Sequence, residues 1–245
     1  MIKKIFRLIK NKKSQKDYRL DSFFNDYDSF EKLDVQKRFP MSKSEIYPCL
    51  DDNTGVTPFD AHYVYHPAWA ARIIRDINPA LHVDISSTLH FCSMISAFIK
   101  TEFYDFRPAK LNLDNLSCLE GDLTNLAFES NSIASLSCMH TIEHIGLGRY
   151  GDPLDPDGDI KAINELQRVC AVNGDLLIVV PVGVKKILFN AHRIYNPFDI
   201  VNYLDGCTLK KFSLINDAGE FIDDADMENA AEQKYGCGCY WFKKQ

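Results

Sequence analysis

Hydrophobic positions in the middle of the chain follow two different spacings. The run at 81–85, the alternating segment SIASLSCMHTIEHI and the run at 175–180 are bounded by polar or turn-forming residues, as expected for strands of a buried sheet. The segment IKAINELQRVCAV, at 160–172, instead repeats its apolar residues every three or four positions and predicts a helix. Strands and helices that alternate along a chain predict a parallel sheet covered by helices.

The flanking segments extend this pattern. A helix is expected at 67–77, closed by Asn78 and Pro79, and a second helix within SSTLHFCSMISAFI. Further predicted elements are a short strand in EFYDFRP, a helix at 197–205 and closing antiparallel strands at 207–215 and 235–243. The predicted fold class is therefore α/β: a Rossmann-like, doubly wound, mostly parallel sheet with an antiparallel C-terminal edge strand.

The N-terminal segment differs from the rest of the chain. We expect residues 1–50 to be a basic and aromatic lead-in segment and residues 51–245 to form one domain. The first 16 residues contain seven Lys or Arg and no acid, and their apolar residues recur at helical spacing: Ile2, Ile5, Phe6, Leu8 and Ile9. One interpretation is a short amphipathic helix that makes peripheral contact with an anionic membrane or a partner. The other is a solvated tail.

Composition excludes several classes of function. The net charge of −6 argues against a surface made for nucleic acid. Apolar runs stay short of the roughly 20 residues that span a bilayer, and a secretory signal pattern is absent, so we expect a cytoplasmic protein. Cys237 and Cys239 are closer together than the usual spacing of metal ligands, so no metal site is expected. The sequence does not indicate an oligomeric state.

Polar residues follow each predicted strand of the parallel part. In an open parallel sheet, ligands bind outside the carboxyl ends of the strands. The residues at these positions, in serial order, are Asp84, Ser86 and Ser87, then Asp105 and Arg107, then Asp122 and Leu123, then His140, Glu143 and His144. An Asp at a strand end is often only the N-cap of the next helix. Four such clusters in order favour a ligand site.

Several of these motifs carry a family resemblance. The segments HVDISS, YDFRP, GDLTNLAFESNSIASLSCMHTIEH and LQRVCAVNGDLLIVVPVG resemble the successive motifs of class I S-adenosylmethionine-dependent methyltransferases. More narrowly, EHIGLGRYGDPLDPDGD followed by FNAHRIYNP looks like a bacterial methyltransferase-like family, domain-of-unknown-function family 268, whose members are often associated with surface-polysaccharide genes. The resemblance covers about residues 55–243.

This resemblance implies an S-adenosylmethionine-dependent methyltransferase that O-methylates a sugar or glycan precursor in surface polysaccharide biosynthesis. Two alternatives remain open. One is a catalytically degenerate methyltransferase fold that acts as a carbohydrate- or protein-binding module. The other is an enzyme that uses a different nucleotide, such as a nucleotide sugar.

By the same resemblance, residues after the first three strands bind the cofactor, S-adenosylmethionine: Asp84, Ser86, Ser87, Asp105, Asp122 and Leu123. The first three would meet its methionine moiety, the fourth its ribose hydroxyls and the last two its adenine. The usual glycine-rich turn DxGxGxG reads DISSTLH here, and Ser86 replaces even the single glycine of the DIGS that family 268 usually has. Its Cβ would narrow the pocket or shift the loop.

Methyl transfer to a hydroxyl requires a base that removes the hydroxyl proton. His140 or His144 is the candidate base, with Glu143 orienting it. The long polar segment 146–159 and the motif FNAHRIYNP supply the candidate acceptor-binding residues: Arg149, Tyr150, Asp152, Asp155, His192 and Arg193. The alternative for each of these is that it only holds its loop in place.

Overall fold

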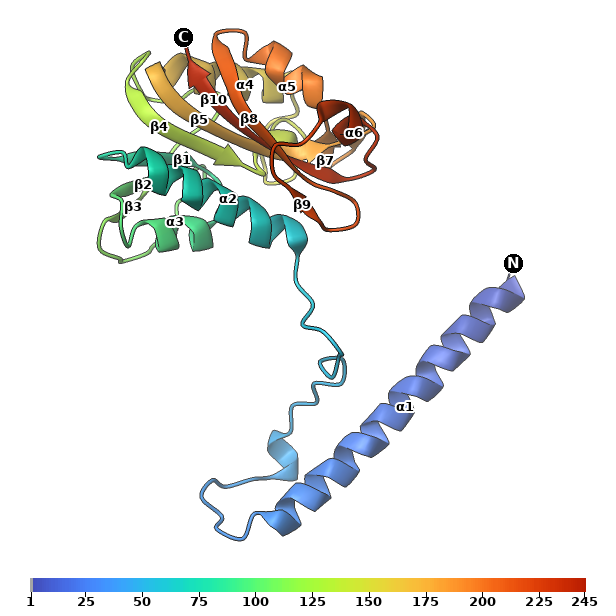
Figure 1. Ribbon diagram of the computed structural model, residues 1–245. Helices are drawn as coiled ribbons and strands as arrows, with labels where there is room; N and C mark the ends of the chain where they lie inside the picture. The colour runs from blue at the N-terminus through green and yellow to red at the C-terminus, as the bar shows by residue number, and fades with distance from the viewer. Residues whose placement is uncertain (1) are drawn as a thin grey trace. The chain divides into compact units, whose positions relative to one another are not determined.

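The computed structural model describes the backbone of residues 2–245 and the side chains of residues 18–245. The chain divides into two units, Met1–Phe59 and Asp60–Gln245, each described by itself (Figure 1). Helix α1 (Ile2–Leu33) and the 3-10 helix η1 (Lys43–Glu45) belong to the first unit. The short N-terminal helix of the sequence pattern is thus the start of a 32-residue helix. The apolar side chains that carry the membrane interpretation lie outside the described residues.

An eight-stranded sheet forms the centre of the second unit, in the order β3-β2-β1-β4-β5-β10-β8-β9. Five strands pair in parallel: β1 (His82–Ile85), β2 (Thr101–Asp105), β3 (Leu116–Glu120), β4 (Ile133–Met139) and β5 (Cys170–Val182). The last strand, β10 (Gly236–Lys244), runs antiparallel between β5 and β8 (Cys207–Ile215), and β9 (Phe221–Ile222) extends the edge. The predicted fold class is confirmed.

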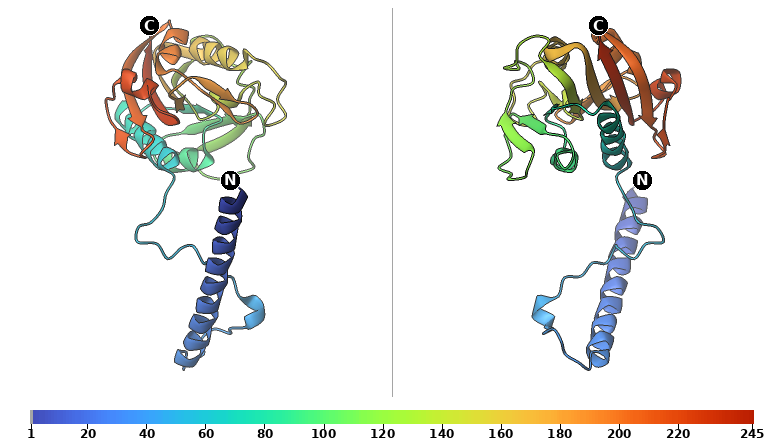
Figure 2. Two further views of the ribbon diagram at one scale, coloured as in Figure 1. Left: turned by 90° about the vertical axis from the view of Figure 1, so that its right-hand side faces the viewer. Right: turned by 60° about the vertical axis from the view of Figure 1, so that its left-hand side comes forward.

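Helices cover the two faces of this sheet (Figure 2). Helices α2 (Ala61–Ile77) and α3 (Leu89–Ile95) contribute Trp69, Ile74 and Phe91 to one buried apolar cluster. The other cluster is covered by α4 (Gly158–Val169), α5 (Pro197–Tyr203) and α6 (Met227–Ala231). A separate hairpin of β6 (Lys186–Leu188) and β7 (His192–Ile194) follows β5. Strands β1, β4 and the second half of β5 are therefore buried on both faces, as their continuous apolar runs predict.

Helix α2 begins six residues before the predicted start at Pro67. Asp60 is the N-cap, and its carboxylate accepts a hydrogen bond from the N–H of Tyr63 at 3.2 Å. Pro67 lies in the interior of the helix, where it cannot donate to the carbonyl of Tyr63 and its ring crowds that carbonyl, and its side chain is buried. Asn78 ends the helix in the left-handed conformation, as predicted. The longer helix brings His62 and Tyr63 to the region described below.

Two connections between parallel strands contain no helix in the described chain. Residues 106–115 join β2 to β3, and residues 121–132 join β3 to β4, as turns and irregular segments. The boundary between α4 and β5 also differs from the prediction, because the chain leaves the helix after Val169 and Cys170 already belongs to the strand. The acids that follow β2 and β3 consequently have no helix N-terminus to cap.

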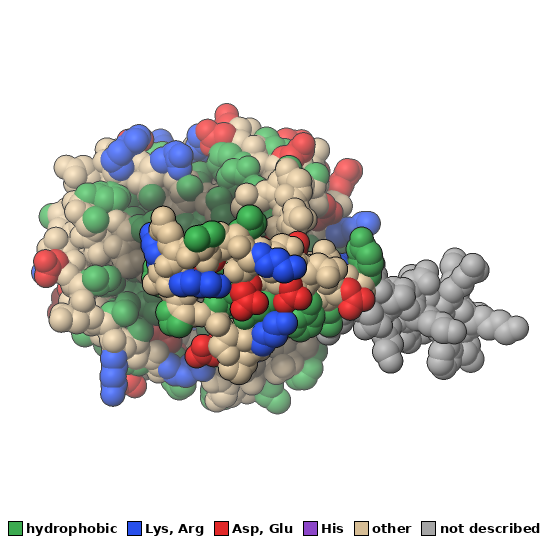
Figure 3. All heavy atoms as spheres, turned by 90° about the horizontal axis from the view of Figure 1, so that it is seen from below, with side chains coloured by type: hydrophobic (Ala, Val, Ile, Leu, Met, Phe, Trp, Pro, Cys, Tyr) green, Lys and Arg blue, Asp and Glu red, His purple; other side chains and the backbone are tan. Residues whose placement is uncertain are grey.

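The surface of the described residues carries mixed charge. On the face drawn in Figure 3, Lys and Arg side chains are interspersed with Asp and Glu, and they do not gather into one broad basic area there. Within the described part of the chain, none of the helices has the length and apolar character that crossing a membrane requires.

Candidate functional site

A cleft of about 940 Å³ opens at the carboxyl ends of the parallel strands. Thirteen of the fifteen predicted site residues line it: Ser86, Ser87, Asp105, Asp122, Leu123, His140, Glu143, His144, Arg149, Tyr150, Asp152, Asp155 and His192. Pockets of roughly 300–1,000 Å³ are typical of small-molecule sites. The cleft is thus open, and it lies at the edge of the sheet that the topology predicts.

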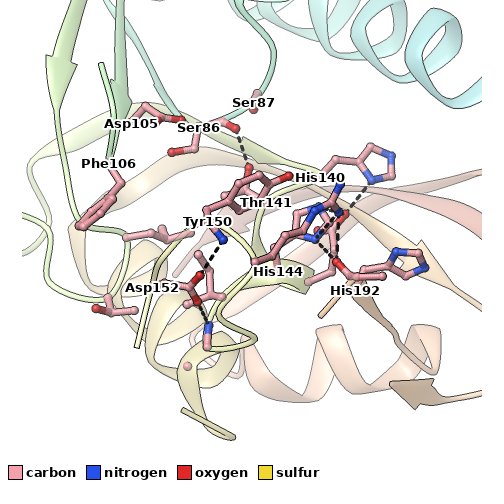
Figure 4. Close-up of a pocket in the computed structure, with 18 of the residues that line it drawn as sticks. Ser86, Ser87, Asp105, Phe106, His140, Thr141, His144, Tyr150, Asp152 and His192 are labelled. Atoms are coloured by element: carbon pink, nitrogen blue, oxygen red, sulfur yellow. Dashed lines mark hydrogen bonds and ion pairs between the residues drawn. The ribbon is translucent and has the colours of Figure 1, made fainter. Parts of the chain in front are cut away.

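The cleft has two chemically different ends (Figure 4). Ser86 and Asp105 lie at one end, and Asp122 belongs with them because it follows β3, the neighbour of β2 in the sheet; we call this the acidic end. The opposite end, formed by His140, Glu143, His144 and His192, is the histidine end. Tyr150 lies between the two ends, with the guanidinium of Arg107 at 5.0 Å and that of Arg149 at 5.1 Å from its ring centroid. Contacts of this kind hold an aromatic ring in place.

Ser86 adopts the backbone conformation that favours glycine. Its φ is +57°, in the left-handed region that costs a non-glycine residue roughly 1–2 kcal/mol. Both its N–H and its hydroxyl donate to the carbonyl of Tyr104, at 2.7 and 3.0 Å. The turn after β1 therefore keeps the shape of a glycine turn, but a serine Cβ is present where the cleft begins.

The loops that follow β1 and β4 are joined by two hydrogen bonds. The hydroxyl of Thr141 donates to the carbonyl of Ser86 at 2.6 Å, and the hydroxyl of Ser87 accepts from the N–H of Met139 at 2.9 Å. Strands β1 and β4 are neighbours at the point where the strand order reverses. The two serines are therefore engaged by the backbone of adjacent strands.

Asp84 does not line the cleft, in contrast to the sequence expectation. Its side chain is fully buried behind the loop, where it accepts hydrogen bonds from the N–H of Ser87 at 3.0 Å and from the hydroxyl of Ser137. Burial raises the pKa of Asp84 to about 6, because the charged form loses its hydration. The residue holds the loop after β1 from within the core, since the end of a fully buried strand is still inside the protein.

The two acids of the acidic end do reach the cleft. Asp105 accepts the N–H of Arg107 at 2.7 Å through Oδ1, and Asp122 uses its Oδ1 for the N–H and hydroxyl of Thr124 at 2.8 and 2.7 Å. Each acid thus stabilises its own turn with one oxygen and leaves Oδ2 for a ligand. Neither caps a helix, so the capping alternative does not account for them. Leu123, 4% exposed, provides the adjoining apolar wall.

The three predicted catalytic residues lie together at the histidine end. Glu143, 1% exposed, accepts a hydrogen bond from Nδ1 of His140 at 2.9 Å, and its Oε1 lies 3.9 Å from Nε2 of His144. With Nδ1 of His140 donating, Nε2 is the unprotonated nitrogen of the neutral ring, and this nitrogen faces Sγ of Cys237 at 3.4 Å. The free nitrogen of His140 is therefore occupied by another side chain.

His144 has the geometry of a base that is ready to accept a proton. Its Nδ1 donates to the carbonyl of Ala191 at 2.6 Å, which leaves Nε2 as the unprotonated nitrogen in the neutral ring. Nearby, Nε2 of His192 is buried and has no hydrogen-bond partner among the described residues. Burial also lowers the pKa of His192. Within the described part of the chain, the two imidazoles thus each have an Nε2 without a hydrogen-bond partner at this end of the cleft.

Two predicted acceptor-binding acids organise the loop between β4 and α4. Asp152 accepts hydrogen bonds from the N–H groups of Gly146, Gly148 and Tyr150, at 2.7, 3.3 and 3.2 Å. Asp155 accepts from the N–H of Asp157 at 3.0 Å and pairs with Lys161 at 2.6 Å. These contacts match the alternative in which the acids hold the loop.

Arg193, also predicted to bind the acceptor, likewise holds the loop instead. It is 5% exposed and does not line the cleft. Its guanidinium donates to the carbonyls of Ile145 at 2.6 Å and Pro156 at 3.2 Å, and it pairs with Asp159 at 3.4 Å. Because these partners flank the loop on both sides, Arg193 anchors it.

Some residues of the cleft were not predicted from the sequence. The aromatic side chains among them are Tyr63, Phe106, Phe189 and Tyr235. Tyr63 lies in the first turns of α2, before Pro67, where the sequence does not predict a helix. Tyr235 directly precedes β10. A signal was available for the first of these, because Asp60 is a good N-cap residue.

Comparison with known families agrees with the sequence motifs. Residues 120–232 match the family model DUF268, described as a Caenorhabditis protein of unknown function. The expected resemblance to family 268 is confirmed over this segment, although the description names Caenorhabditis where bacteria were expected. No curated protein matches the chain.

Solved structures with the same fold include three that are informative. BH2331 from Bacillus halodurans C-125, a proposed methyltransferase, has 12% identity and a TM-score of 0.52, over 73% of this chain and 98% of its own. The N-methyltransferase NodS from Bradyrhizobium japonicum WM9, solved with S-adenosyl-L-homocysteine, has 9% identity and a TM-score of 0.50, over 73% and 85%. The [4+2]-cyclase SpnF has 12% identity and a TM-score of 0.50, over 73% and 80%. The chain has the fold of class I S-adenosylmethionine-dependent methyltransferases.

Proposed function

We propose that this protein transfers a methyl group from S-adenosylmethionine to a hydroxyl of a sugar or glycan precursor, with His144 as the base. The observation that carries the proposal is that one cleft is lined by two strand-end acids and, at its other end, by a histidine whose Nδ1 donates to a backbone carbonyl. Such a separation provides one end for a nucleoside and another for proton removal.

The acidic end suits the nucleoside part of the cofactor. Asp105 accepts the ribose hydroxyls and Asp122 the adenine amino group, each through the oxygen that its own turn does not use. Leu123 packs against the base. When bound, S-adenosylmethionine supplies a methyl group on a positively charged sulfur. The cleft volume of about 940 Å³ accommodates such a molecule and an acceptor.

The histidine end supplies proton removal. Nε2 of His144 takes the proton of the acceptor hydroxyl, because Nδ1 is committed to the carbonyl of Ala191. The carboxylate of Glu143, 3.9 Å from Nε2, stabilises the positive ring that results. His140 orients that carboxylate through its Nδ1.

Polar and aromatic groups around the histidine end favour a hydroxyl-rich acceptor. Arg149 and Tyr150 line this part of the cleft, and the unpartnered Nε2 of His192 can accept a hydrogen bond from an acceptor hydroxyl. We place the reaction in surface polysaccharide biosynthesis in the cytoplasm, with the basic N-terminus as a peripheral membrane contact. We propose no nucleic-acid partner.

Calorimetric titration with S-adenosyl-L-homocysteine tests the cofactor part of the proposal. We expect saturable binding with a stoichiometry of one, followed by methylation of a nucleotide sugar or oligosaccharide detected by mass spectrometry with isotopically labelled S-adenosylmethionine. Absence of binding at millimolar concentration would rule out the enzyme.

One observation favours a second candidate, a degenerate fold that binds a carbohydrate or a protein without catalysis. Ser86 brings a Cβ to the turn where the resemblance predicts glycine, and it does so at a positive φ. A glycan or nucleotide sugar that raises the melting temperature, while S-adenosyl-L-homocysteine leaves it unchanged, would support this candidate.

A further inference from the structure

Three potential metal ligands meet behind the histidine end of the cleft. They are His62 on α2, His140 after β4 and Cys237 on β10. One ligand atom from each residue lies within 4.8 Å of the other two. We propose that these side chains form a binding site for a divalent transition metal ion of the Zn²⁺ type. The site is separate from the proposed roles of Asp105, Asp122 and His144.

The distance between the ligand atoms of His140 and Cys237 fits a tetrahedral ion. Zn²⁺ binds imidazole nitrogen at about 2.0–2.1 Å and thiolate sulfur at about 2.3 Å, so these two ligand atoms are roughly 3.6 Å apart around one ion. Nε2 of His140 and Sγ of Cys237 are 3.4 Å apart. Binding replaces the thiol proton of Cys237, which passes to solvent, and water completes the fourth position.

The donor types select the class of metal. Imidazole and thiolate ligands favour zinc and related transition ions, whereas Mg²⁺ and Ca²⁺ prefer oxygen. A site with three protein ligands and one open position is typical of reactive zinc rather than of structural zinc. His140 lines the cleft, so the ion would adjoin the space for the acceptor.

Glu143 supplies the supporting interaction that metal-bound histidines commonly have. Its Oε1 accepts the hydrogen bond of Nδ1 of His140, which leaves Nε2 of that ring for the ion. Glu143 is 1% exposed, no Lys or Arg pairs with it among the described residues, and its Oε2 is buried without a partner. A buried carboxylate without a cation is costly, and an ion on the far side of His140 supplies the missing positive charge.

A second histidine on α2, His66, also has a buried nitrogen without a hydrogen-bond partner within the described chain. His62 and His66 are four residues apart, so they share one face of the helix. His66 is fully buried, its Nδ1 hydrogen-bonds the carbonyl of His62 at 2.6 Å, and its Nε2 has no partner. Its ring centroid lies 5.0 Å from that of His140. Unpaired buried nitrogen of this kind is rare without a ligand nearby.

The same contacts could also be those of a catalytic triad. Its nucleophile would be Cys237, its base His140 and its orienting acid Glu143. Cys237 is fully buried, however, and does not line the cleft. A substrate in the cleft cannot reach this sulfur, so a metal role explains the arrangement better than covalent catalysis.

Cobalt titration of the full chain tests the site. The protein is first freed of metal with a chelator, and Co²⁺ is then added under anaerobic conditions. We expect one Co²⁺ per chain, with a thiolate-to-metal charge-transfer band in the near ultraviolet and intense visible bands of a tetrahedral ion. Competition by Zn²⁺ should abolish the spectrum, and elemental analysis should give one zinc.

Variants assign the ligands. Cys237→Ala should remove the charge-transfer band, and His62→Asn should weaken Co²⁺ binding at least tenfold. Glu143→Gln should keep the band and weaken binding by about 10–100-fold. The matched controls are Cys118→Ala, a partly buried thiol on β3, and His90→Asn, an exposed histidine on α3. Both should bind Co²⁺ like the wild type.

A wild-type protein without the charge-transfer band, or a Cys237→Ala variant that retains it, would overturn the proposal. If Cys237→Ala does not fold, His62→Asn decides, because His62 is only partly buried. Unchanged Co²⁺ affinity in a folded His62→Asn variant would equally overturn it. None of these outcomes depends on methyl transfer.

Discussion

At the acidic end of the cleft, Asp105 and Asp122 are partly or fully exposed and interact mainly with their own turns, whereas His140 and Glu143 at the histidine end are buried among residues from distant parts of the chain. An exposed acid can be changed at little cost to the fold. A buried group is coupled to its partners, so its removal leaves unpaired polar atoms. The comparison predicts that a substitution at the acidic end can weaken ligand binding without lowering the stability of the fold. Substitution of a buried residue at the histidine end should affect both.

The largest effect is expected from His144→Gln, which tests whether the histidine end contains a base. Glutamine cannot accept and release the proton, so the rate of methyl transfer should fall by about 10²–10⁴-fold. The affinity for S-adenosyl-L-homocysteine, measured by calorimetry, should stay the same. His90→Gln, on an exposed face of α3, serves as the control. A variant with full activity would remove His144 from the mechanism.

Asp84→Asn sharpens the contrast between buried and exposed acids. The pKa of Asp84 is raised from 3.8 to about 6 in the folded protein, so its contribution to stability is complete below pH 3.8 and is lost as the pH rises through 6. The asparagine does not titrate. Between pH 4 and pH 8, the unfolding free energy of the wild type should therefore fall by roughly 2 kcal/mol relative to the variant, because each unit of pKa shift is worth about 1.4 kcal/mol and part of the effect is already lost at pH 4.

Denaturant unfolding at several pH values measures this difference. Asp114→Asn, at an exposed position in the connection between β2 and β3, should show a difference that hardly varies with pH. A constant difference for Asp84→Asn as well would mean that the buried carboxyl ionises as it does in the unfolded chain.

Asp105→Asn tests the acidic end. Loss of the charged acceptor should weaken S-adenosyl-L-homocysteine binding by about 10–100-fold, since a hydrogen bond to a charged group contributes roughly 1.5–3 kcal/mol. The melting temperature should change little, because the asparagine oxygen can still accept the N–H of Arg107. Asp114→Asn should leave binding intact. A large loss of stability in Asp105→Asn would show that this acid supports the fold instead.

The smallest effect is expected from Ser86→Gly. Glycine removes the cost of the positive φ and the hydrogen bond of the hydroxyl to Tyr104, so the unfolding free energy should change by less than about 1 kcal/mol. Affinity for S-adenosyl-L-homocysteine should rise severalfold, because the Cβ no longer narrows the cleft. Asn173→Gly, at a positive φ outside the cleft, should leave affinity unchanged. Weaker binding in Ser86→Gly would contradict this account.

The parallel strands and most of the cleft could be predicted from the sequence, because apolar runs and the polar residues that end them are local signals. Asp105, Asp122 and His144 were found in this way. Asp84 was misplaced because a strand-end position does not reveal that the strand ends inside the protein. The predicted roles of the site residues stay predictions.

Long-range contacts were beyond sequence reasoning. His62 and Cys237 are separated by most of the domain and meet only because β10 is inserted between β5 and β8. The pattern His-x-x-x-His at His62 and His66 places both side chains on one face only if the helix begins before Pro67, and the proline predicts a later start. For Arg193 likewise, the sequence does not reveal the carbonyl groups on both sides of the loop that bind its guanidinium.

Two hydrogen bonds, from Thr141 to Ser86 and from Met139 to Ser87, cross the point where the strand order reverses. They link the turn expected to meet the cofactor with the segment that positions His140 and Glu143. Displacement of either loop by an incoming molecule must strain or break these bonds. The two hydrogen bonds thereby tie the turn at the acidic end to the segment at the histidine end.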